Sequence, residues 1–198
     1  MSGNPKNIIV LGATGVIGRH IISELINARD SFGRLAIFTS EDTLQRKSSE
    51  IETLKAKGVD VVVGDITNTA DIQRAYKDVD TVVSAVGRPI IDAQIKLLEV
   101  AESTPHVKYF YPSEYGTDIE YGPQSKNEKP HQLKLKVRKY IKDNIHRLQY
   151  TYLVTGPYAD LYIGKTRDEK AGSFDVLGRK ATLLGTGKER ISLTTMRE

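Results

Sequence analysis

A glycine-rich stretch near the N-terminus constrains this chain more than any other feature of its sequence. Residues 12–18 read Gly-Ala-Thr-Gly-Val-Ile-Gly, between a short apolar run at residues 8–11 and apolar residues at helical spacing through Ile26. A strand, a glycine-rich turn and a helix in this order are typical of a dinucleotide-binding loop. Glycine permits the tight turn and lets a pyrophosphate approach the backbone, while the helix N-terminus offers free N–H groups to the phosphates. The sequence therefore predicts a dinucleotide site at this turn.

Strand and helix patterns alternate through residue 155. Further short apolar runs lie at residues 35–39, 59–63, 81–86, 107–111 and 150–155. Helical patterns separate these runs, as expected for parallel strands, which need crossover connections. We therefore predict an α/β fold in which residues 1–155 form a doubly wound, parallel-sheet Rossmann domain that binds NAD(P).

Several helix boundaries are predicted from single residues. A charged helix begins near Leu44 and ends at Gly58, which suits a C-terminal cap. Asn68 or Thr69 caps the helix that follows. The last helix of the domain comes after Pro130, and its apolar face consists of Leu133, Val137, Ile141 and Ile145.

The rhythm of strands and helices changes after Gly156. Two short strands are expected at residues 181–184 and 191–193, around the turn Gly-Thr-Gly at residues 185–187. We expect residues 156–198 to be a partial substrate-binding region, with a truncated product, a fragment and a naturally short form left open.

Composition excludes several classes of protein. The chain has no cysteine and its four histidines show no ligand spacing, so we expect no metal site. The net charge is +4, and the basic excess lies between Lys126 and Arg147, where only Tyr140 could stack on bases; we expect no nucleic-acid partner. No apolar stretch reaches the roughly 18 residues of a membrane span, and the N-terminus lacks a signal-peptide pattern. We therefore expect a cytoplasmic protein without a membrane partner, with homo-oligomer formation left open.

The end of the second strand bears on the choice between NAD and NADP. An acidic residue there accepts from the ribose 2′-OH, whereas Arg or Lys pairs with a 2′-phosphate. Thr39 and Ser40 could donate to a phosphate, while Glu41 could reject it. Lys47 and Arg19 are further candidates for the 2′-phosphate. These residues by themselves leave the choice open.

Several segments carry a resemblance to a known family. Residues 107–116 read Val-Lys-Tyr-Phe-Tyr-Pro-Ser-Glu-Tyr-Gly, and residues 134–138 read Lys-Leu-Lys-Val-Arg, followed by Tyr-Thr-Tyr at residues 150–152. Together with the glycine-rich loop, residues 58–65, residues 80–87 and Gln94, they resemble the NmrA-like and isoflavone reductase-like atypical short-chain dehydrogenases, which include phenylcoumaran benzylic ether reductases. The likeness spans most of residues 6–160, and residues 107–116 are its most specific part.

The resemblance implies NADP(H) rather than NAD(H) as cofactor. The cofactor-binding residues that we predict lie in the loop and at the carboxyl ends of the strands, where ligands bind in open α/β sheets. They are Gly12, Thr14, Gly15, Val16, Ile17, Gly18, Thr39, Ser40, Lys47, Asp65, Ala85, Val86, Gly87, Gln94, Pro112, Ser113 and Glu114. The substrate contacts that we predict are Tyr115 and Tyr158, with core packing as an alternative for Tyr158.

The resemblance also nominates Lys134 as the catalytic acid or base. The Tyr-x-x-x-Lys dyad common in short-chain dehydrogenases is missing, because no tyrosine is followed four residues later by lysine. Apolar walls and a positive nicotinamide ring would lower the pKa of Lys134 and suit it to carry protons. We expect an NADPH-dependent reductase that transfers hydride to a small aromatic or enone-like substrate. The alternatives are an NmrA-like redox sensor that binds dinucleotide without catalysis and a broad quinone reductase.

Overall fold

A computed structural model describes residues 6–160, 173–175, 177–183, 185–188, 190 and 192–196 of the chain. The chain divides into two compact units. The first comprises Met1–Glu114 and Ile119–Leu153, and the second comprises Tyr115–Asp118 and Val154–Glu198. Each unit is described by itself below.

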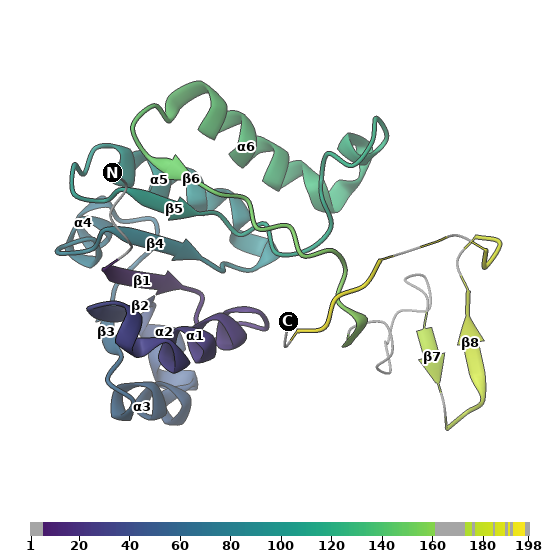
Figure 1. The fold of residues 1–198 in the computed structure, drawn as a ribbon, viewed down its shortest axis with the longest axis horizontal. Helices are drawn as coiled ribbons and strands as arrows, with labels where there is room; N and C mark the ends of the chain where they lie inside the picture. The colour runs from purple at the N-terminus through teal and green to yellow at the C-terminus, as the bar shows by residue number, and fades with distance from the viewer. Residues whose placement is uncertain are drawn as a thin grey trace. The chain divides into compact units, whose positions relative to one another are not determined.

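Six parallel strands form the sheet of the first unit, in the order β3-β2-β1-β4-β5-β6 (Figure 1). They are β1 (Asn7–Leu11), β2 (Arg34–Thr39), β3 (Asp60–Val63), β4 (Thr81–Ser84), β5 (Tyr109–Tyr111) and β6 (Gln149–Tyr150). The chain first builds outward from β1 to β3 and then returns to the other side of β1 with β4. This reversal confirms the doubly wound α/β fold, and it creates the crevice in which such sheets bind ligands.

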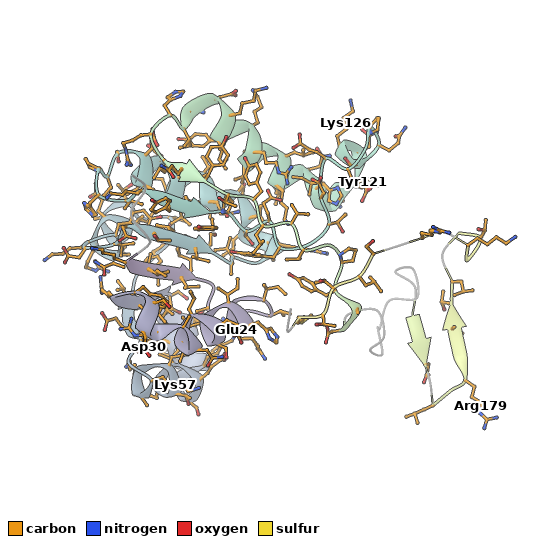
Figure 2. All side chains as sticks on the ribbon, viewed as in Figure 1. Glu24, Asp30, Lys57, Tyr121, Lys126 and Arg179 are labelled. Atoms are coloured by element: carbon orange, nitrogen blue, oxygen red, sulfur yellow. The ribbon has the colours of Figure 1, made fainter. Side chains whose placement is uncertain are left out.

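Helices connect these strands, and they lie between the apolar runs of the sequence. The α-helices are α1 (Gly18–Asn27), α2 (Glu41–Arg46), α3 (Ser48–Ala56), α4 (Thr69–Ala75), α5 (Gln94–Glu102) and α6 (Gln132–Asn144). The 3-10 helices are η1 (Arg29–Ser31), η2 (Arg88–Ala93), η3 (Ser125–Asn127) and η4 (Lys129–His131). Exposed charged side chains such as Glu24, Asp30 and Lys57 lie on and between them (Figure 2). Among the described residues, no helix has the length and apolar character needed to cross a membrane.

The last strand of the sheet, β6, ends earlier than predicted, whereas β5 ends at Tyr111 as predicted. The ladder of β6 stops at Tyr150, with one more backbone bond from Thr151 N to Phe110 O, whereas the sequence predicts a strand to residue 155. Its neighbour β5 ends at Tyr111 because Pro112 has no N–H, and the Pro112 carbonyl accepts instead from Glu114 N. Without a partner strand to pair with, β6 cannot continue.

The charged helix predicted from Leu44 to Gly58 is two helices. The α2 helix begins earlier than predicted, because the Ser40 hydroxyl caps it by accepting from Thr43 N. It breaks at Lys47, and α3 then runs to Ala56. The caps predicted at Gly58, which has a φ of +78°, and at Asn68, which accepts from Ala70 N and Asp71 N, are confirmed.

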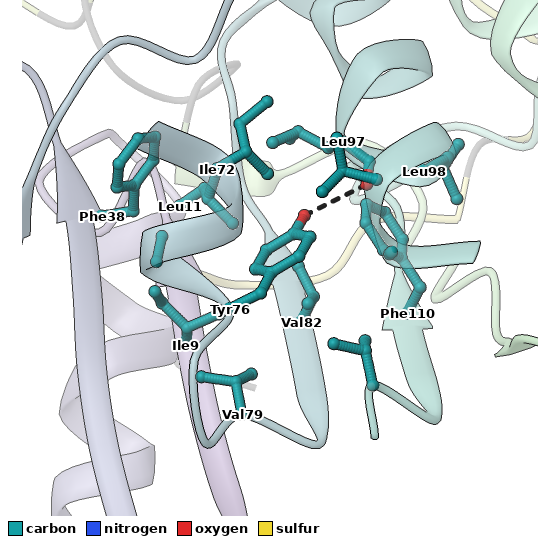
Figure 3. Packing of buried hydrophobic residues seen from close by; sticks show 14 of the residues in the cluster. Ile9, Leu11, Phe38, Ile72, Tyr76, Val79, Val82, Leu97, Leu98 and Phe110 are labelled. Carbon is teal, nitrogen blue, oxygen red and sulfur yellow. Dashed lines mark hydrogen bonds between the residues drawn. The ribbon is translucent and has the colours of Figure 1, made fainter. Parts of the chain in front are cut away.

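Both faces of the central strands are buried, which is why their sequences are continuous apolar runs. Ile9 and Leu11 of β1 pack in a cluster with side chains from α4, α5 and α6, while Ile8 and Val10 are buried outside that cluster. Tyr76 lies in the cluster, and its hydroxyl donates to the Leu97 carbonyl at 3.2 Å (Figure 3). Burial raises the pKa of Tyr76, so this phenol stays neutral.

The predicted apolar face of α6 is correct except at its beginning. Val137, Ile141 and Ile145 are buried in the cluster, but Leu133 is 37% exposed. Lys134 turns inward in its place, because a buried carboxylate lies there to receive it. The N-terminal part of α6 therefore faces the protein with a charge rather than with an apolar side chain.

A carboxylate joins the end of α5 to the start of β6. Glu102 accepts from the backbone N–H groups of His146, Arg147 and Leu148 at 3.0, 2.7 and 3.0 Å. Burial opposes its ionisation, but these three N–H groups outweigh burial and lower the pKa of Glu102. Glu102 thus satisfies backbone donors that would otherwise have no partner before the strand begins.

Replacing Glu102 with alanine is expected to lower the free energy of unfolding by about 2 kcal/mol, discounted for a carboxylate that is only partly buried. Because folding lowers its pKa, this stabilisation is complete above the ordinary glutamate pKa of about 4.3 and is lost as the pH falls through the folded-state pKa. Urea unfolding at neutral and acidic pH measures both effects. The matched control is Glu52→Ala, whose exposed carboxylate pairs only with Lys55 one turn away. Equal losses in the two variants would contradict the role of Glu102.

In the second unit, β7 (Ser173–Asp175) and β8 (Lys180–Thr182) form an antiparallel pair. The strand predicted at residues 181–184 is therefore present but shifted, and its partner is β7 rather than residues 191–193. The Asp175 carboxylate accepts from Gly178 N at 2.9 Å in the turn between β7 and β8. Residues 192 and 193 lie in no strand, and Leu184 and Ile191 fall outside the described residues.

Candidate functional site

The glycine-rich loop packs its backbone directly against the end of β4. Gly12 has a φ of +76°, and a Cβ atom there would lie 2.4 Å from the Ala85 carbonyl oxygen. A Cβ atom on Gly18 would lie 2.0 Å from the Gly12 carbonyl oxygen, which itself accepts from Gly15 N at 2.9 Å. Gly12 and Gly18 are thus needed for close backbone approaches, while a Cβ atom on Gly15 would lie 3.0 Å from the Gly12 carbonyl oxygen. The helix α1 begins at Gly18 without a side-chain cap, and Val16 is 58% exposed in the loop ahead of it.

Two cations lie at this loop. The Lys47 ammonium, at the break between α2 and α3, donates to the Thr14 carbonyl oxygen. The Arg19 guanidinium donates from Nε to the Gly15 carbonyl oxygen at 3.3 Å. Both residues were predicted from their position in the sequence, but the helix break that brings Lys47 to the loop was not. A phosphate at the N-terminus of α1 would meet two positive charges.

A cleft of about 660 Å³ opens beside the loop, at the carboxyl ends of β1, β2, β3 and β4. Seven of the predicted cofactor residues line it: Gly12, Thr14, Thr39, Ser40, Asp65, Val86 and Gly87. Its remaining walls include apolar side chains that the sequence did not single out, namely Phe38, Ile66 and Ile90. A volume of this size, with apolar walls and a phosphate-binding loop at one side, suits the adenosine part of a dinucleotide.

Acidic side chains line the same cleft near the ends of β2 and β3. The Asp65 carboxylate accepts from the N–H and the hydroxyl of Thr67, both at 2.8 Å, and these bonds lower the pKa of Asp65. Asp71 accepts from Asp65 N at 2.8 Å, and this bond followed by the one from Arg74 lowers its pKa as well. Both groups are therefore ionised at neutral pH. Carboxylates in this position can accept from ribose hydroxyls.

Some predicted cofactor residues are engaged in structural contacts instead. Gln94 is 1% exposed; its oxygen accepts from Ser113 N at 2.7 Å and its amide donates to Ile91 O at 3.0 Å. The buried Ser113 hydroxyl donates to the Val86 carbonyl at 3.0 Å. These bonds tie the end of β5 to the end of β4, beside the cleft rather than in it. Direct cofactor contacts by Gln94, Pro112 and Ser113 stay a prediction.

A buried ionic cluster follows β5. The Glu114 carboxylate is 1% exposed and accepts two bonds from the Arg138 guanidinium, each 3.2 Å long. The Lys134 ammonium lies 3.9 Å from the same carboxylate. The predicted cofactor ligand Glu114 is therefore the buried counter-ion of two cations on α6, because Lys134 and Arg138 are about one helical turn apart and so lie on the same face.

The Lys134 ammonium is largely buried, with only 16% of its side chain exposed. Burial lowers the pKa of Lys134; the nearby Glu114 opposes this shift, while the positive charges of Arg88 and Arg138 reinforce it. Burial thus lowers the pKa in the predicted direction, while the effect of a nicotinamide ring and the catalytic role of Lys134 stay predictions. A lysine of this kind can release and recover a proton close to the strand ends.

The two predicted substrate residues both belong to the second unit. Tyr158 is 8% exposed, and its hydroxyl accepts from the Thr155 hydroxyl at 2.9 Å. Burial raises the pKa of Tyr158. This environment agrees with packing, the alternative stated for this residue, and a substrate contact by Tyr115 or Tyr158 stays a prediction.

The order of the strands and the glycine-rich loop together define the class of protein. A six-stranded parallel sheet in the order 3-2-1-4-5-6, with a glycine-rich turn after its first strand, makes this a Rossmann-fold protein. The sequence model of the NmrA-like family matches residues 4–168, and the chain belongs to that family.

Relatives with known names are reductases. The chain is 29% identical over 190 residues to phenylcoumaran benzylic ether reductase PT1 of Pinus taeda, covering 96% of this chain and 60% of that protein. It is also 29% identical to isoflavone reductase of Pisum sativum over 201 residues, covering 96% of this chain and 62% of that one. Among solved structures, AtPrR2 with NADP⁺ and (+)pinoresinol superposes with a TM-score of 0.67 at 27% identity, covering 79% of this chain and 52% of that one. The chain thus spans about 60% of the length of the curated relatives it matches.

Proposed function

We propose that this chain is the cofactor-binding part of an NADP(H)-dependent reductase that acts on a small aromatic or enone-like substrate. The observation that carries the proposal is the largely buried Lys134, which has a lowered pKa in a Rossmann unit whose cleft suits the adenosine part of a dinucleotide. The names of the relatives support it, since two are reductases and AtPrR2 is solved with NADP⁺ and (+)pinoresinol. A quinone acceptor belongs to the same reaction class.

The residues present fit a dinucleotide. Gly12, Gly15 and Gly18 carry no side chain at three positions of the loop, so that a pyrophosphate can approach the backbone there and the N-terminus of α1. Asp65 lies in the cleft where a ribose hydroxyl could donate to it. When bound, the reduced nicotinamide supplies a hydride to the substrate.

Lys134 then holds the proton that the reduced substrate needs. Its ammonium donates the proton as negative charge develops on the substrate, and it recovers a proton from solvent after product release. The lowered pKa makes this donation easier than it would be for an exposed lysine. Glu114 and Arg138 stay fixed beside it, because their own bidentate pair is buried.

The preference for NADP(H) over NAD(H) rests on Lys47. Its ammonium reaches the phosphate loop, while the other cation of this segment, Arg46, pairs with Asp42. Glu41 and Asp42 line the same cleft and oppose a 2′-phosphate, so the preference depends on the positive charge at Lys47.

Replacing Lys47 with alanine is therefore expected to weaken NADPH binding about tenfold, which corresponds to about 1.4 kcal/mol, and to leave NADH binding nearly unchanged. Calorimetric titration with both cofactors measures the two affinities. Arg46→Ala is the matched control one residue away, and it should not weaken NADPH binding. An equal loss for NADPH and NADH would show that Lys47 supports the loop but does not select the 2′-phosphate.

The proposed function is tested by titrating the chain with NADPH and NADH and then following NADPH oxidation with a panel of phenolic, enone and quinone acceptors. We expect micromolar NADPH binding, about 8 kcal/mol, and turnover of at least one acceptor. Binding without turnover of any acceptor would favour the alternative function, an NmrA-like redox sensor that reports the cofactor state to a protein partner. Failure to bind either cofactor would contradict both.

A further inference from the structure

In the buried cluster after β5, one carboxylate lies between two cations. The two cations differ in their distance from it and in whether they form hydrogen bonds with it. Arg138 forms two bonds to the Glu114 carboxylate at 3.2 Å, whereas the Lys134 ammonium stays at 3.9 Å. A direct ammonium–carboxylate hydrogen bond is about 2.7–2.9 Å long. Lys134 therefore senses the charge of Glu114 without being tied to it by a close hydrogen bond.

Arg138 is itself held in place from three sides. Its Nη1 donates to Glu120 at 2.6 Å, its Nε and Nη2 are committed to Glu114, and its guanidinium lies 4.5 Å from the centre of the Tyr152 ring. Only 11% of its side chain is exposed. A planar guanidinium with this set of contacts matches the carboxylate with little freedom to move.

We propose that Arg138 is a positioning residue, which occupies the Glu114 carboxylate in a bidentate pair and so keeps it from closing on the Lys134 ammonium. This inference rests on the proposed function, in which Lys134 must be able to donate its proton. Without the guanidinium, Glu114 would be a buried carboxylate with Lys134 as the cation beside it, and the two would form a tight ion pair. Lys134 would then be slow to give up its proton.

The proposal predicts that removing either partner of the Glu114–Arg138 pair changes Lys134 in opposite directions. Arg138→Gln takes away a positive charge and frees Glu114, so the pKa of Lys134 should rise by about one pH unit or more. Glu114→Gln takes away the negative charge, so the pKa of Lys134 should fall below its value in the unaltered chain. Loss of structure alone would move both variants toward the ordinary lysine value. Among the described residues, the other charged group that acts on Lys134 is Arg88, which is unchanged in every variant.

The experiment is an NMR titration of the Lys134 ¹³Cε resonance, assigned by its loss in Lys134→Arg. Arg138→Lys, which retains the charge, should leave the Lys134 pKa nearest to that of the unaltered chain. If Arg138→Gln does not fold, Glu114→Gln is compared with the double variant Glu114→Gln/Arg138→Gln. The double variant removes both charges of the pair, so neither is left buried without its partner. The charge of Arg138 also lowers the Lys134 pKa directly, so the double variant should show a small rise over Glu114→Gln. Arg138 acts through Glu114 if this rise is well below one pH unit.

Shifts of the same sign in Arg138→Gln and Glu114→Gln would overturn the inference, as would a large difference between Glu114→Gln and the double variant. The titration does not depend on turnover, so it separates this inference from the proposed function. If the Lys134 pKa moves as expected but the pH profile of turnover does not follow it, the positioning role stands and the catalytic role of Lys134 fails.

Discussion

Lys134→Ala is expected to lower turnover about 10²–10⁴-fold, the range that a positioned general acid contributes. NADPH affinity should stay nearly unchanged, because Lys134 lies in the buried cluster with Glu114 and Arg138, whereas the cleft is lined by the loop and the ends of the first four strands. The loss should appear mainly in kcat, since the proton is needed as charge develops on the substrate. Steady-state oxidation of NADPH and calorimetric titration of the same variant measure the two quantities.

The pH dependence adds a second test of the same residue. A general acid must be protonated, so turnover should fall as the pH rises through the pKa of Lys134. Burial lowers that pKa, so the fall should begin at a lower pH than for an ordinary lysine, whose pKa is about 10.4. Lys134→Arg, which cannot lose its proton in this range, should lack the fall altogether and have low activity at every pH.

Lys139→Ala is the control for both measurements. It removes a lysine of the same helix whose side chain is 78% exposed and pairs with Asp143. Turnover in this variant should match that of the unaltered chain. If Lys134→Ala has normal turnover, or if Lys139→Ala loses as much, Lys134 is not the proton carrier.

The second large effect is expected from Gly12→Ala. The φ of +76° costs an L-residue about 1 kcal/mol, and the new Cβ atom would also meet the Ala85 carbonyl oxygen at 2.4 Å. Because that oxygen belongs to backbone at the end of β4, the loop must move away from the sheet. We expect the free energy of unfolding to fall by about 3 kcal/mol and NADPH affinity to fall about 100-fold or more.

Gly58→Ala separates the two causes. Gly58 has a φ of +78°, almost the same as Gly12, but a Cβ atom there would meet nothing within 4 Å. This variant should therefore lose only about 1 kcal/mol of stability and bind NADPH normally. Urea unfolding and calorimetry of both variants test the comparison. Equal destabilisation would mean that backbone conformation, and not the close approach to β4, explains why position 12 is glycine.

Much of the cofactor site could be predicted from the sequence because its determinants are local. The order of strand, glycine-rich turn and helix lies within residues 8–26, and the close backbone approaches that require Gly12 and Gly18 are consequences of that turn. The strand periodicity is also local, and it correctly predicted six parallel strands. The break at Lys47 was missed because the sequence around it is helical on both sides.

The ionic cluster shows what local patterns cannot supply. Apolar spacing places Leu133 on the inner face of α6, but the structure turns Lys134 inward and leaves Leu133 exposed. The decisive partner, Glu114, lies 20 positions earlier and becomes buried only when β5 and α6 pack in the same unit.

The sequence by itself thus determined the Rossmann fold and the glycine-rich turn after its first strand, and through resemblance it nominated Lys134, whose role stays a prediction. Only the tertiary structure decided that Gln94 and Ser113 brace the strand ends, that Lys47 reaches Thr14, and that Glu114 is shared by Lys134 and Arg138. The physical reason is that periodicity and turn chemistry act over a few residues. Burial, and the charge pairs it requires, depend on which distant segments the folded chain brings together.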